Sequence, residues 1–338
     1  MKNNRATIHD IAKALNIDSS TVSRALNNSP RVSKKTKQRI LDKAKEIGYQ
    51  RNVLASNLRM QKSNSIGVIV PRISRHFFSS VIAGIEEQAY ESGYNVIICQ
   101  SLEQLAREQN ITETLLSNRV DGVLISVSME TENYEHLLRL QKNGIPFLFF
   151  DRHYEIEGIS SVIIDDYKGG FDATEHLILK GCKTIAHLSG PQVLKIYKNR
   201  LRGYLDALKK HNIKFKPELV IYSRLMEQDG ADSAKKILSL DVEVDAIFAA
   251  NDISAIGAIK YLKKKSINIP KDVKIVGFSN EPISQVIEPS LTTINQPGFE
   301  MGKKATEMLI EKTMNKTSVL DNETVVLRPT LIERASSE

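Results

Sequence analysis

The sequence predicts two domains of different fold class: a small all-α helix-turn-helix domain, followed by a larger α/β domain of two lobes with parallel sheets. Apolar residues recur at helical spacing over residues 6–48, with capping residues between the helices. From Ser65 onward, short apolar strands alternate with amphipathic helices. The length of 338 residues also exceeds the roughly 250–300 residues at which single cores stop growing. A single compact domain is therefore excluded.

Positive charge is concentrated at the start of the chain. The whole sequence has 47 Lys and Arg against 40 Asp and Glu, a formal charge of +7. Residues 1–62 hold 14 of the basic residues and four acids, so this segment carries +10 and the remainder −3. A charge cluster alone is more typical of a solubilising basic tail. The alternative is a small nucleic-acid-binding module ahead of a slightly acidic body.

Three short amphipathic helices favour the folded module over the tail. Their apolar stripes are Ile8, Ile11, Ala12 and Leu15, then Val22 and Leu26, then Ile40, Leu41, Ala44 and Ile47. Residues that can cap the helices are Thr7 with Asp10 as a capping box, Asn16 after the first helix, Asp18 or Ser19 before the second, Ser33 before the third and Gly48 after it. A disordered tail would lack this periodicity.

The second helix has a polar outward face. A helix, a tight turn and a second helix form the arrangement that places a recognition helix in the DNA major groove. The outward residues are short or hydrogen-bonding: Ser19, Ser20, Thr21, Ser23 and Arg24. Many three-helix bundles share this shape without touching DNA, but here Lys and Arg flank the polar face. Spacing and charge together favour DNA binding.

The body contains two series of strands. The first series is Ile66–Val70, Asn95–Cys99, Gly122–Ser126 and Phe147–Asp151. The second is Val162–Ile164, Thr184–Leu188, Leu219–Tyr222, Ala246–Ala249 and Lys274–Phe278. Strand–helix alternation predicts parallel sheets covered on both faces, hence two Rossmann-like lobes. A ligand site is expected between the lobes, at the carboxyl ends of the strands.

Polar residues follow several of these strands, and they are candidates for that site. They are Ser126, Asp151, Asn251, Ser279 and Asn280, with Arg200 near the start of a helix. Each one alone is as typical of a helix cap or turn, but together they favour a polar cleft for a hydroxyl-rich small molecule. Phe77 and Phe78 offer an aromatic wall or, equally well, pack in the core.

These segments match a known family along the whole chain. Residues 7–27 read TIHDIAKALNIDSSTVSRALN, and VSKKTKQRI follows at 32–40, with Gly48, Tyr49, Asn52 and Leu58 after it. The body adds SIGVIVP at 65–71, DGV at 121–123, ND at 251–252 and LTTINQ at 291–296. In this order and at these separations the chain resembles the lactose-repressor/galactose-repressor (LacI/GalR) family of bacterial transcriptional regulators.

The resemblance implies which residues of the first domain contact DNA. Ser19 and Ser20 hold the family's base-reading positions, and Arg24 can pair with O6 and N7 of a guanine. Caps and phosphate-contacting groups would be Thr7, Asp18, Thr21, Ser23, Asn27, Arg31, Ser33 and Thr36.

Residues 50–62 resemble the family's hinge helix, which folds when paired with its dimer mate on the operator; an ordinary linker is the alternative. Leu58 would insert between base steps of the minor groove. Asn52, Ala55 and Arg59 would pack against that groove or its phosphates. The family usually has Pro where this chain has Arg51, which makes the lead-in less rigid.

The resemblance also implies the division of the body. It gives a helix-turn-helix domain at 1–49, the hinge at 50–62 and a periplasmic-binding-protein-like effector and dimerisation domain at 63–338. The chain would cross between lobes three times, with an N-lobe at about 63–161 and 293–326 and a C-lobe at about 162–292 and 327–338. Effector-binding candidates are Phe77, Phe78, Ser126, Asp151, Arg200, Asn251, Ser279, Asn280 and Gln296.

The implied function is that of a repressor that binds a palindromic operator in double-stranded DNA as a homodimer and is released by a small effector. Many sugar-responsive relatives have acidic residues where this chain has Ser279 and Asn280. Without these two carboxylates the cleft is less negative. An acidic effector such as a sugar acid or a sugar phosphate is therefore a hypothesis beside a neutral sugar. No leucine heptad follows Arg334, so we expect a dimer rather than a tetramer. No cofactor is expected.

Other function classes fit less well. No apolar segment at the N-terminus suggests a signal peptide, which argues against a transport solute-binding protein. No apolar run approaches the ~18 residues of a membrane span, and Cys99 and Cys182 suit a reducing compartment, so we expect a cytoplasmic, nucleoid-associated protein. His176, Cys182 and His187 match no zinc spacing. Without a P-loop, GxSxG or HExxH motif, a sugar-metabolising enzyme on this fold remains only an alternative.

Overall fold

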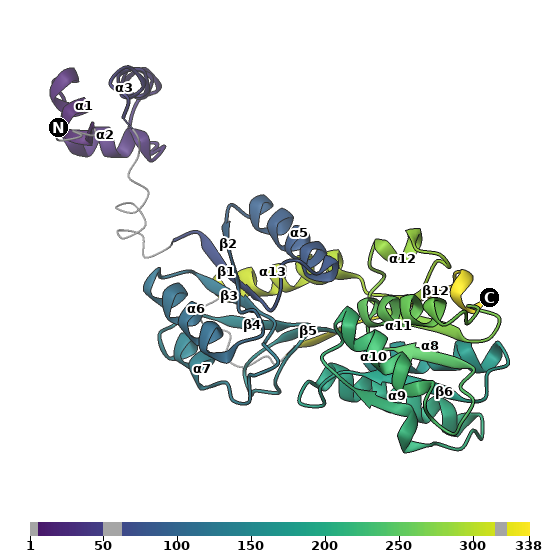
Figure 1. Ribbon diagram of the computed structural model, residues 1–338. Helices are drawn as coiled ribbons and strands as arrows, with labels where there is room; N and C mark the ends of the chain where they lie inside the picture. The colour runs from purple at the N-terminus through teal and green to yellow at the C-terminus, as the bar shows by residue number, and fades with distance from the viewer. Residues whose placement is uncertain (1–5, 50–62, 315–322) are drawn as a thin grey trace. The chain divides into compact units, whose positions relative to one another are not determined.

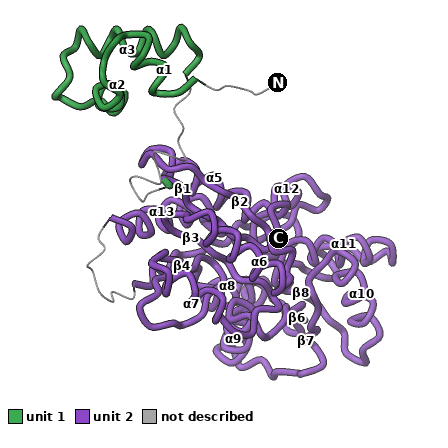
Figure 2. The backbone as a smooth tube through the Cα atoms, turned by 90° about the vertical axis from the view of Figure 1, so that its left-hand side faces the viewer, with its two compact units in different colours: residues 1–63 green, residues 64–338 purple. Residues whose placement is uncertain are grey.

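The computed structural model describes residues 6–49, 63–314 and 323–338. They form two compact units, Met1–Ser63 and Asn64–Glu338, which Figure 2 colours separately. The predicted hinge lies outside the described residues, with its candidate DNA contacts Asn52, Ala55, Leu58 and Arg59.

The described part of the first unit consists of three helices around a small apolar core. They are α1 (Ile8–Leu15), α2 (Ser19–Leu26) and α3 (Lys34–Glu46). Ile11, Val22 and Ile40, one from each helix, have no exposed surface. The expectation that Leu41 faces this core is wrong, since its side chain is 40% exposed. Successive helical positions point roughly 100° apart, so Leu41 cannot share the buried direction of Ile40.

The predicted caps of α1 and α2 are confirmed. Thr7 accepts a hydrogen bond from the Asp10 N–H, and Asp10 Oδ2 accepts one from the Thr7 N–H at 2.8 Å. Asn16 ends α1 with φ 52°, a left-handed conformation that asparagine tolerates. Asp18 begins α2 by accepting the Ser20 N–H at 2.7 Å. These local bonds produce the tight turn between the two helices.

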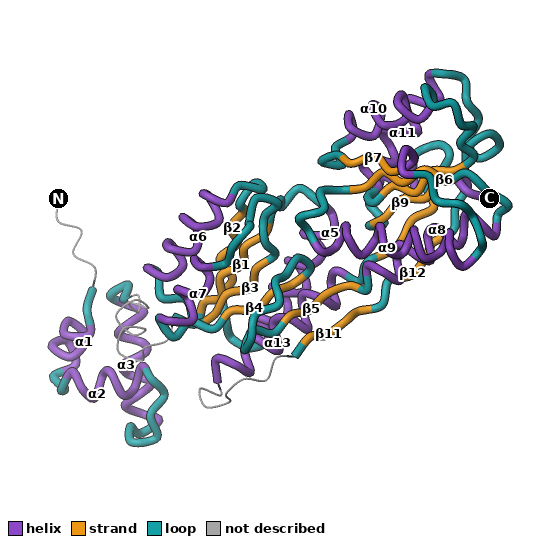
Figure 3. Tube along the Cα trace, turned by 90° about the horizontal axis from the view of Figure 1, so that it is seen from below, coloured by secondary structure: helices purple, strands orange, loops and turns teal. Residues whose placement is uncertain are grey.

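The second unit contains two six-stranded sheets, one in each lobe (Figure 1, Figure 3). The first-lobe sheet has the order β11-β5-β4-β3-β1-β2, and all of its neighbouring strands are parallel. Its strands are β1 (Ser65–Val70), β2 (Asn95–Gln100), β3 (Gly122–Ile125), β4 (Phe147–Phe150), β5 (Ser161–Ile164) and β11 (Thr324–Leu327).

The second-lobe sheet has the order β12-β10-β9-β8-β6-β7. Its strands are β6 (Ile185–Ser189), β7 (Val220–Tyr222), β8 (Ala246–Ala249), β9 (Lys274–Phe278), β10 (Thr292–Asn295) and β12 (Thr330–Ile332). Only β12 departs from the predicted parallel arrangement, because it returns antiparallel along β10.

Helices cover both faces of each sheet, as strand–helix alternation predicts. Apolar side chains of α5 and α13 pack on one face of the first sheet and those of α6 and α7 on the other. On the second sheet α10 and α11 cover one face and α8 and α9 the other. The helices are α5 (His76–Glu91), α6 (Leu105–Ser117), α7 (Glu135–Lys142), α8 (Asp166–Leu179), α9 (Lys195–Lys210), α10 (Glu227–Ile237), α11 (Asp252–Lys264), α12 (Ile283–Val286) and α13 (Gly298–Met314), with 3₁₀ turns η1 (Pro217–Leu219) and η2 (Ala335–Ser337). Within the described segments, no helix has the length and apolar content needed to span a membrane.

Two predicted lobe boundaries are corrected by the sheet pairing. The division between residues 161 and 162 is wrong, because β5 pairs with β4 and β11 in the first sheet. The division at about residues 292 and 293 moves to the end of β10, because β10 pairs with β9 and β12 in the second sheet. The chain therefore passes between the lobes after β5, after β10 and after β11. The number of crossings is the three that the family resemblance implies.

Helices α8 and α9 touch through their backbones. A Cβ on Gly170 would lie 2.3 Å from the Arg200 carbonyl oxygen, and one on Gly203 would lie 2.3 Å from the Tyr167 carbonyl oxygen. Only glycine permits this approach, since real Cβ atoms do not come so close. The crossing brings α9, which carries Arg200, against the start of α8, which carries Asp166.

Candidate functional site

The outward face of α2 combines short polar side chains with one unpaired arginine. Ser20 and Arg24 are exposed, and Ser19, Thr21 and Ser23 are half-buried. The Arg24 guanidinium forms no hydrogen bond or ion pair with any described residue. Its five N–H donors are therefore available to an external acceptor.

The first unit carries more positive charge than its acids neutralise. Residues 6–49 contain nine Lys and Arg and four acids, and the one ion pair among these residues joins Lys43 to Glu46 at 2.7 Å. Asp18 forms no ion pair among residues 6–49, and its pKa is kept below the usual value by hydrogen bonds from Ser20 and, to a smaller extent, by the charge of Arg24. Unpaired cations around a polar helix face provide the attraction that nucleic-acid phosphates require.

Several other predicted DNA contacts also support the local fold. Ser33 caps α3 by accepting the Thr36 N–H at 3.2 Å. The Asn27 amide donates to the Ser23 carbonyl oxygen at 2.9 Å. Thr7 is a cap, and Arg31 is exposed in the loop after α2. All candidates within residues 6–49 thus lie at helix starts, on α2 or directly after it, and their contacts with DNA stay a prediction.

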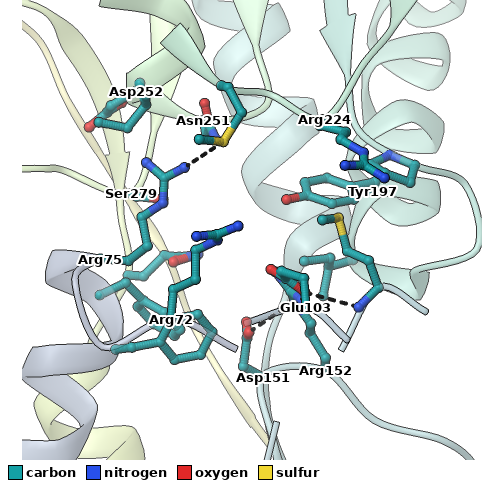
Figure 4. Close-up of a pocket in the computed structure, with 18 of the residues that line it drawn as sticks. Arg72, Arg75, Glu103, Asp151, Arg152, Tyr197, Arg224, Asn251, Asp252 and Ser279 are labelled. Carbon is teal, nitrogen blue, oxygen red and sulfur yellow. Dashed lines mark hydrogen bonds and ion pairs between the residues drawn. The ribbon is translucent and has the colours of Figure 1, made fainter. Parts of the chain in front are cut away.

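The second unit has a cavity of about 550 Å³ between its lobes (Figure 4). The residues that line it follow β1, β2, β3 and β4 of the first lobe and β6, β7, β8, β9 and β10 of the second. This is where parallel α/β sheets are expected to bind a ligand. The volume suits a small metabolite, since ligand pockets commonly measure roughly 300–1,000 Å³.

Most of the predicted effector residues line this cavity. They are Phe77, Phe78, Asp151, Arg200, Asn251, Ser279 and Gln296. Phe77 and Phe78 are also packed in the first-lobe core, and their contact with an effector stays a prediction. The Asn251 side chain already has two hydrogen-bond partners within the protein. Its amide oxygen accepts the Ser254 N–H at 2.8 Å, and its amide nitrogen donates to the Leu225 carbonyl oxygen at 3.0 Å.

Two predicted effector residues do not line the cavity. Ser126 donates a hydrogen bond to Asp151 Oδ2 at 3.2 Å and so supports a residue that does. The Asn280 amide accepts a hydrogen bond from Arg334 at 2.7 Å and donates one to Asn295 at 3.0 Å. These bonds engage both ends of the Asn280 amide, and the structure does not bring Asn280 into the cavity lining as the prediction expected.

Arg200 is fixed by several interactions. Its Nε and Nη2 donate to Asp166 Oδ1 at 2.8 and 2.7 Å, and its Nη1 donates to the Ala250 carbonyl oxygen at 2.7 Å. The guanidinium carbon lies 3.6 Å from the centroid of the Phe278 ring, which adds a cation–π contact. Burial raises the pKa of Asp166 to about 6, although Arg200 opposes the rise. The carboxylate is therefore ionised at neutral pH and holds Arg200 at the cavity wall.

A second ion pair joins Arg152 to Glu103. Arg152 donates from Nη1 to Glu103 Oε2 at 2.8 Å and from Nη2 to Oε1 at 3.2 Å. Glu103 and the neighbouring cavity residue Asp151 have φ values of 63° and 60°, which residues other than glycine rarely adopt. Burial raises the pKa of Asp151, and Arg152 and Arg200 oppose the rise. Such backbone strain at a cavity is typical of ligand sites.

Asp252 is a buried carboxyl group at the start of α11. Its Oδ1 accepts the Thr293 hydroxyl at 2.6 Å, and its Oδ2 accepts the Glu281 N–H at 2.7 Å. Burial raises its pKa from 3.8 to about 7. The folded protein therefore holds a proton here that the unfolded chain releases at much lower pH.

Asp252→Asn should remove part of the pH dependence of stability. Because the folded pKa is raised, the wild-type protein gains stability from this proton below about pH 4 and loses that gain as the pH rises towards about 7. The asparagine has no such proton to lose. Between about pH 4 and 7, the free energy of unfolding of Asp252→Asn, measured in urea, should fall less than that of the wild type.

The exposed Asp241 provides the control for that measurement. Asp241→Asn should leave the wild-type pH profile unchanged. Parallel profiles for the wild type and Asp252→Asn would contradict a raised pKa at Asp252.

Sequence reasoning missed several cavity residues. They are Arg72, Arg75, Glu103, Arg152, Tyr197, Arg224 and Asp252. The charged ones among them each lie within five positions of the carboxyl end of a strand. Their position after a strand could have identified them as cavity residues. It is a weak signal, because charged residues in strand-to-helix loops are more often exposed to solvent.

Family models match both units. Residues 7–52 match the model of bacterial regulatory proteins of the lacI family. Residues 63–332 match the model of periplasmic binding proteins and the sugar-binding domain of the LacI family. Together these matches cover nearly the whole chain.

Individual proteins match along their full length. The HTH-type transcriptional regulator RegA of Clostridium saccharobutylicum is 34% identical over 334 residues, which are 98% of this chain and 99% of the relative. The HTH-type transcriptional repressor PurR of Mannheimia succiniciproducens is 30% identical over 331 residues, 98% of each chain. A crystal structure of the lac repressor dimer bound to operator and the anti-inducer ONPF superimposes on this chain with a TM-score of 0.87. The match covers 99% of both chains at 24% sequence identity, so the two proteins have the same fold. The relatives are regulators of transcription rather than enzymes.

Proposed function

The chain belongs to the LacI family of DNA-binding transcription regulators, and from that premise we propose that it is a repressor with one palindromic operator sequence. The proposed repressor binds this operator as a homodimer and leaves it when a small carbohydrate-type effector occupies the cavity. The observation that carries the proposal is the outward face of α2, with its exposed Ser20 and unpaired Arg24 on a unit with excess positive charge.

The operator would be read by α2 in the major groove. Arg24 can donate two parallel hydrogen bonds to a guanine, and Ser19 and Ser20 supply short contacts at the start of the helix. The surrounding cations contact phosphates, which adds affinity without sequence information. Thr7 and Ser33 fix the helices around α2, so loss of a cap would misplace the reading face.

The dimer is supported by an apolar edge of the first-lobe sheet. The edge strand β2 exposes Ile97 and Ile98 at 36% and 42%, and Tyr90 at the end of α5 is 78% exposed. Exposed apolar edges of this kind attract a partner or aggregate. A second copy packed on this edge by two-fold symmetry would place two α2 helices on two symmetric half-sites.

The cavity provides the route by which an effector changes DNA binding. A ligand held by residues of both lobes favours one arrangement of the lobes over another. To move the protein from mostly bound to mostly released, the effector must prefer one state by about 10⁴-fold, or about 5.5 kcal/mol. Because its target is chromosomal DNA, the proposed repressor works in the cytoplasm at the nucleoid.

The proposal is tested by fluorescence anisotropy on DNA from upstream of the protein's own gene. The full chain should bind this DNA with an affinity that falls as salt rises, and residues 64–338 should not bind even at low salt. A panel of sugars, sugar acids and purines should contain a compound that weakens binding by the full chain. Equal DNA binding by residues 64–338 would contradict the proposal.

A further inference from the structure

Three arginines that line the cavity have no anionic partner. Arg72, Arg75 and Arg224 form no ion pair with any residue that the structure describes. Arg75 Nη2 lies 3.4 Å from the Met226 sulfur, and a thioether is a weak acceptor. Three guanidinium groups in one cavity repel one another unless an anion joins them.

The arginines come from both lobes. Arg72 and Arg75 follow β1 in the first lobe, and Arg224 follows β7 in the second. In Figure 4 the side chains of Arg72 and Arg75 extend into the cavity on one side, and Arg224 lies across from them beside Tyr197. A ligand group placed among them would contact both lobes at once.

The acids of the cavity are engaged elsewhere. Glu103 is bound to Arg152, and Asp252 accepts hydrogen bonds from Thr293 and from the Glu281 N–H. Asp151 accepts the Ser126 hydroxyl.

Two further lining carboxylates also leave the arginines free. Glu130 accepts the Leu105 N–H at 3.2 Å, and no ion pair joins Glu130 or Glu281 to an arginine within the described residues. Within the described residues, no lining carboxylate is ion-paired with any of the three arginines.

A fourth arginine of the same wall, Arg152, is buried and paired with acids. Arg152 lines the cavity with only 8% of its side chain exposed, and its Nε has no hydrogen-bond partner. This Nε lies 3.9 Å from Asp151 Oδ2, which forms an ion pair with Arg152. Arg152 is therefore engaged by Glu103 and Asp151, unlike the other three arginines.

We propose that the effector carries a phosphomonoester group bound jointly by Arg72, Arg75 and Arg224; this inference rests on the proposed function of the cavity as the effector site. A phosphomonoester carries about −1.5 to −2 charges at neutral pH and three acceptor oxygens, which match several guanidinium forks. A single carboxylate supplies one charge and two oxygens, fewer than three arginines can use. The polar groups of Asp151, Ser279 and Gln296 remain for the hydroxyl groups of a sugar phosphate.

The test compares phosphorylated and unphosphorylated probes on the full chain. Inorganic phosphate, glucose 6-phosphate, glucose and gluconate are titrated by calorimetry and by thermal unfolding at equal concentrations. Glucose 6-phosphate and inorganic phosphate should bind and raise Tm, and glucose should not. Arg72→Gln and Arg224→Gln should each weaken the binding of both phosphates by about 10- to 100-fold.

A matched variant separates the cavity arginines from surface arginines of the same unit. Arg107 is exposed on α6 and does not line the cavity, so Arg107→Gln should bind both phosphates as the wild type does. Phosphate binding that is equal in all variants, or binding of glucose without either phosphate, overturns the proposal. Gluconate that binds as tightly as glucose 6-phosphate overturns it in favour of a sugar acid, and absence of any binding overturns it as well.

The same preparations distinguish this inference from the proposed function. If the chain binds phosphate through Arg72 and Arg224 but binds no DNA, the anion site is supported and the repressor proposal is contradicted. If the chain binds operator DNA but binds neither phosphate, the repressor proposal is supported and the anion site is contradicted.

Discussion

Asp166→Leu should lower the free energy of unfolding by about 3–5 kcal/mol, the usual cost of removing one partner of a buried ion pair. Arg200 and Asp166 have only 4% of each side chain exposed, and their atoms approach to 2.7 Å. Without the carboxylate, the Arg200 guanidinium stays buried with the Ala250 carbonyl oxygen and the Phe278 ring as partners. Urea unfolding at neutral pH, where Asp166 is ionised, measures the loss.

The double variant Asp166→Leu/Arg200→Met provides the control. Replacing both members of a buried pair by apolar residues of similar volume is often neutral. The double variant should therefore recover most of the stability that Asp166→Leu loses. A double variant less stable than Asp166→Leu would show that the pair is not the source of the loss.

Arg24→Ala should weaken binding to the operator by about 10- to 100-fold, because a bidentate arginine–guanine contact contributes roughly 1–3 kcal/mol of discrimination. Binding to random DNA should fall far less, since it depends on the summed charge of the unit. Arg24 is exposed and unpaired, so the substitution should leave the unfolding temperature unchanged. Anisotropy on operator and on scrambled duplex gives both affinities.

Two further variants separate charge from base reading. Arg24→Lys keeps the charge without the planar fork, so it should lose operator discrimination and keep the salt dependence of binding. Arg39→Ala removes a charge from α3 and should weaken operator and scrambled DNA by the same factor. Equal losses on both DNAs for Arg24→Ala would contradict its role in reading the operator.

Local patterns were sufficient to predict most of the elements. The caps at Thr7 and Ser33 and the apolar runs of β1, β8 and β9 depend on neighbouring residues, and each lies where the sequence places it. The lobe boundary failed at β5, which pairs with β4 and with β11, because β11 lies about 160 residues later and no local signal reveals that pairing. The same limit explains β12, whose antiparallel direction depends on β10.

The cavity was predictable in position and only partly in composition. Asp151 and Ser279 follow strands, and the sheet geometry brings them together, as expected. Asn280 follows the same strand as Ser279, but Arg334 from the end of the chain engages its amide. Arg72 and Arg224 were missed because an arginine in a loop is usually solvated, and only the folded lobes show that both line one cavity.

Selection from a randomised duplex library by the full chain tests the central claim most directly. A sequence-specific regulator should enrich one inverted repeat and bind it at least about 10³-fold more tightly than a scrambled duplex at physiological salt. The spacing of the two half-sites should match the two-fold symmetry of a dimer. Recovery of unrelated sequences that all bind with equal affinity would contradict the account.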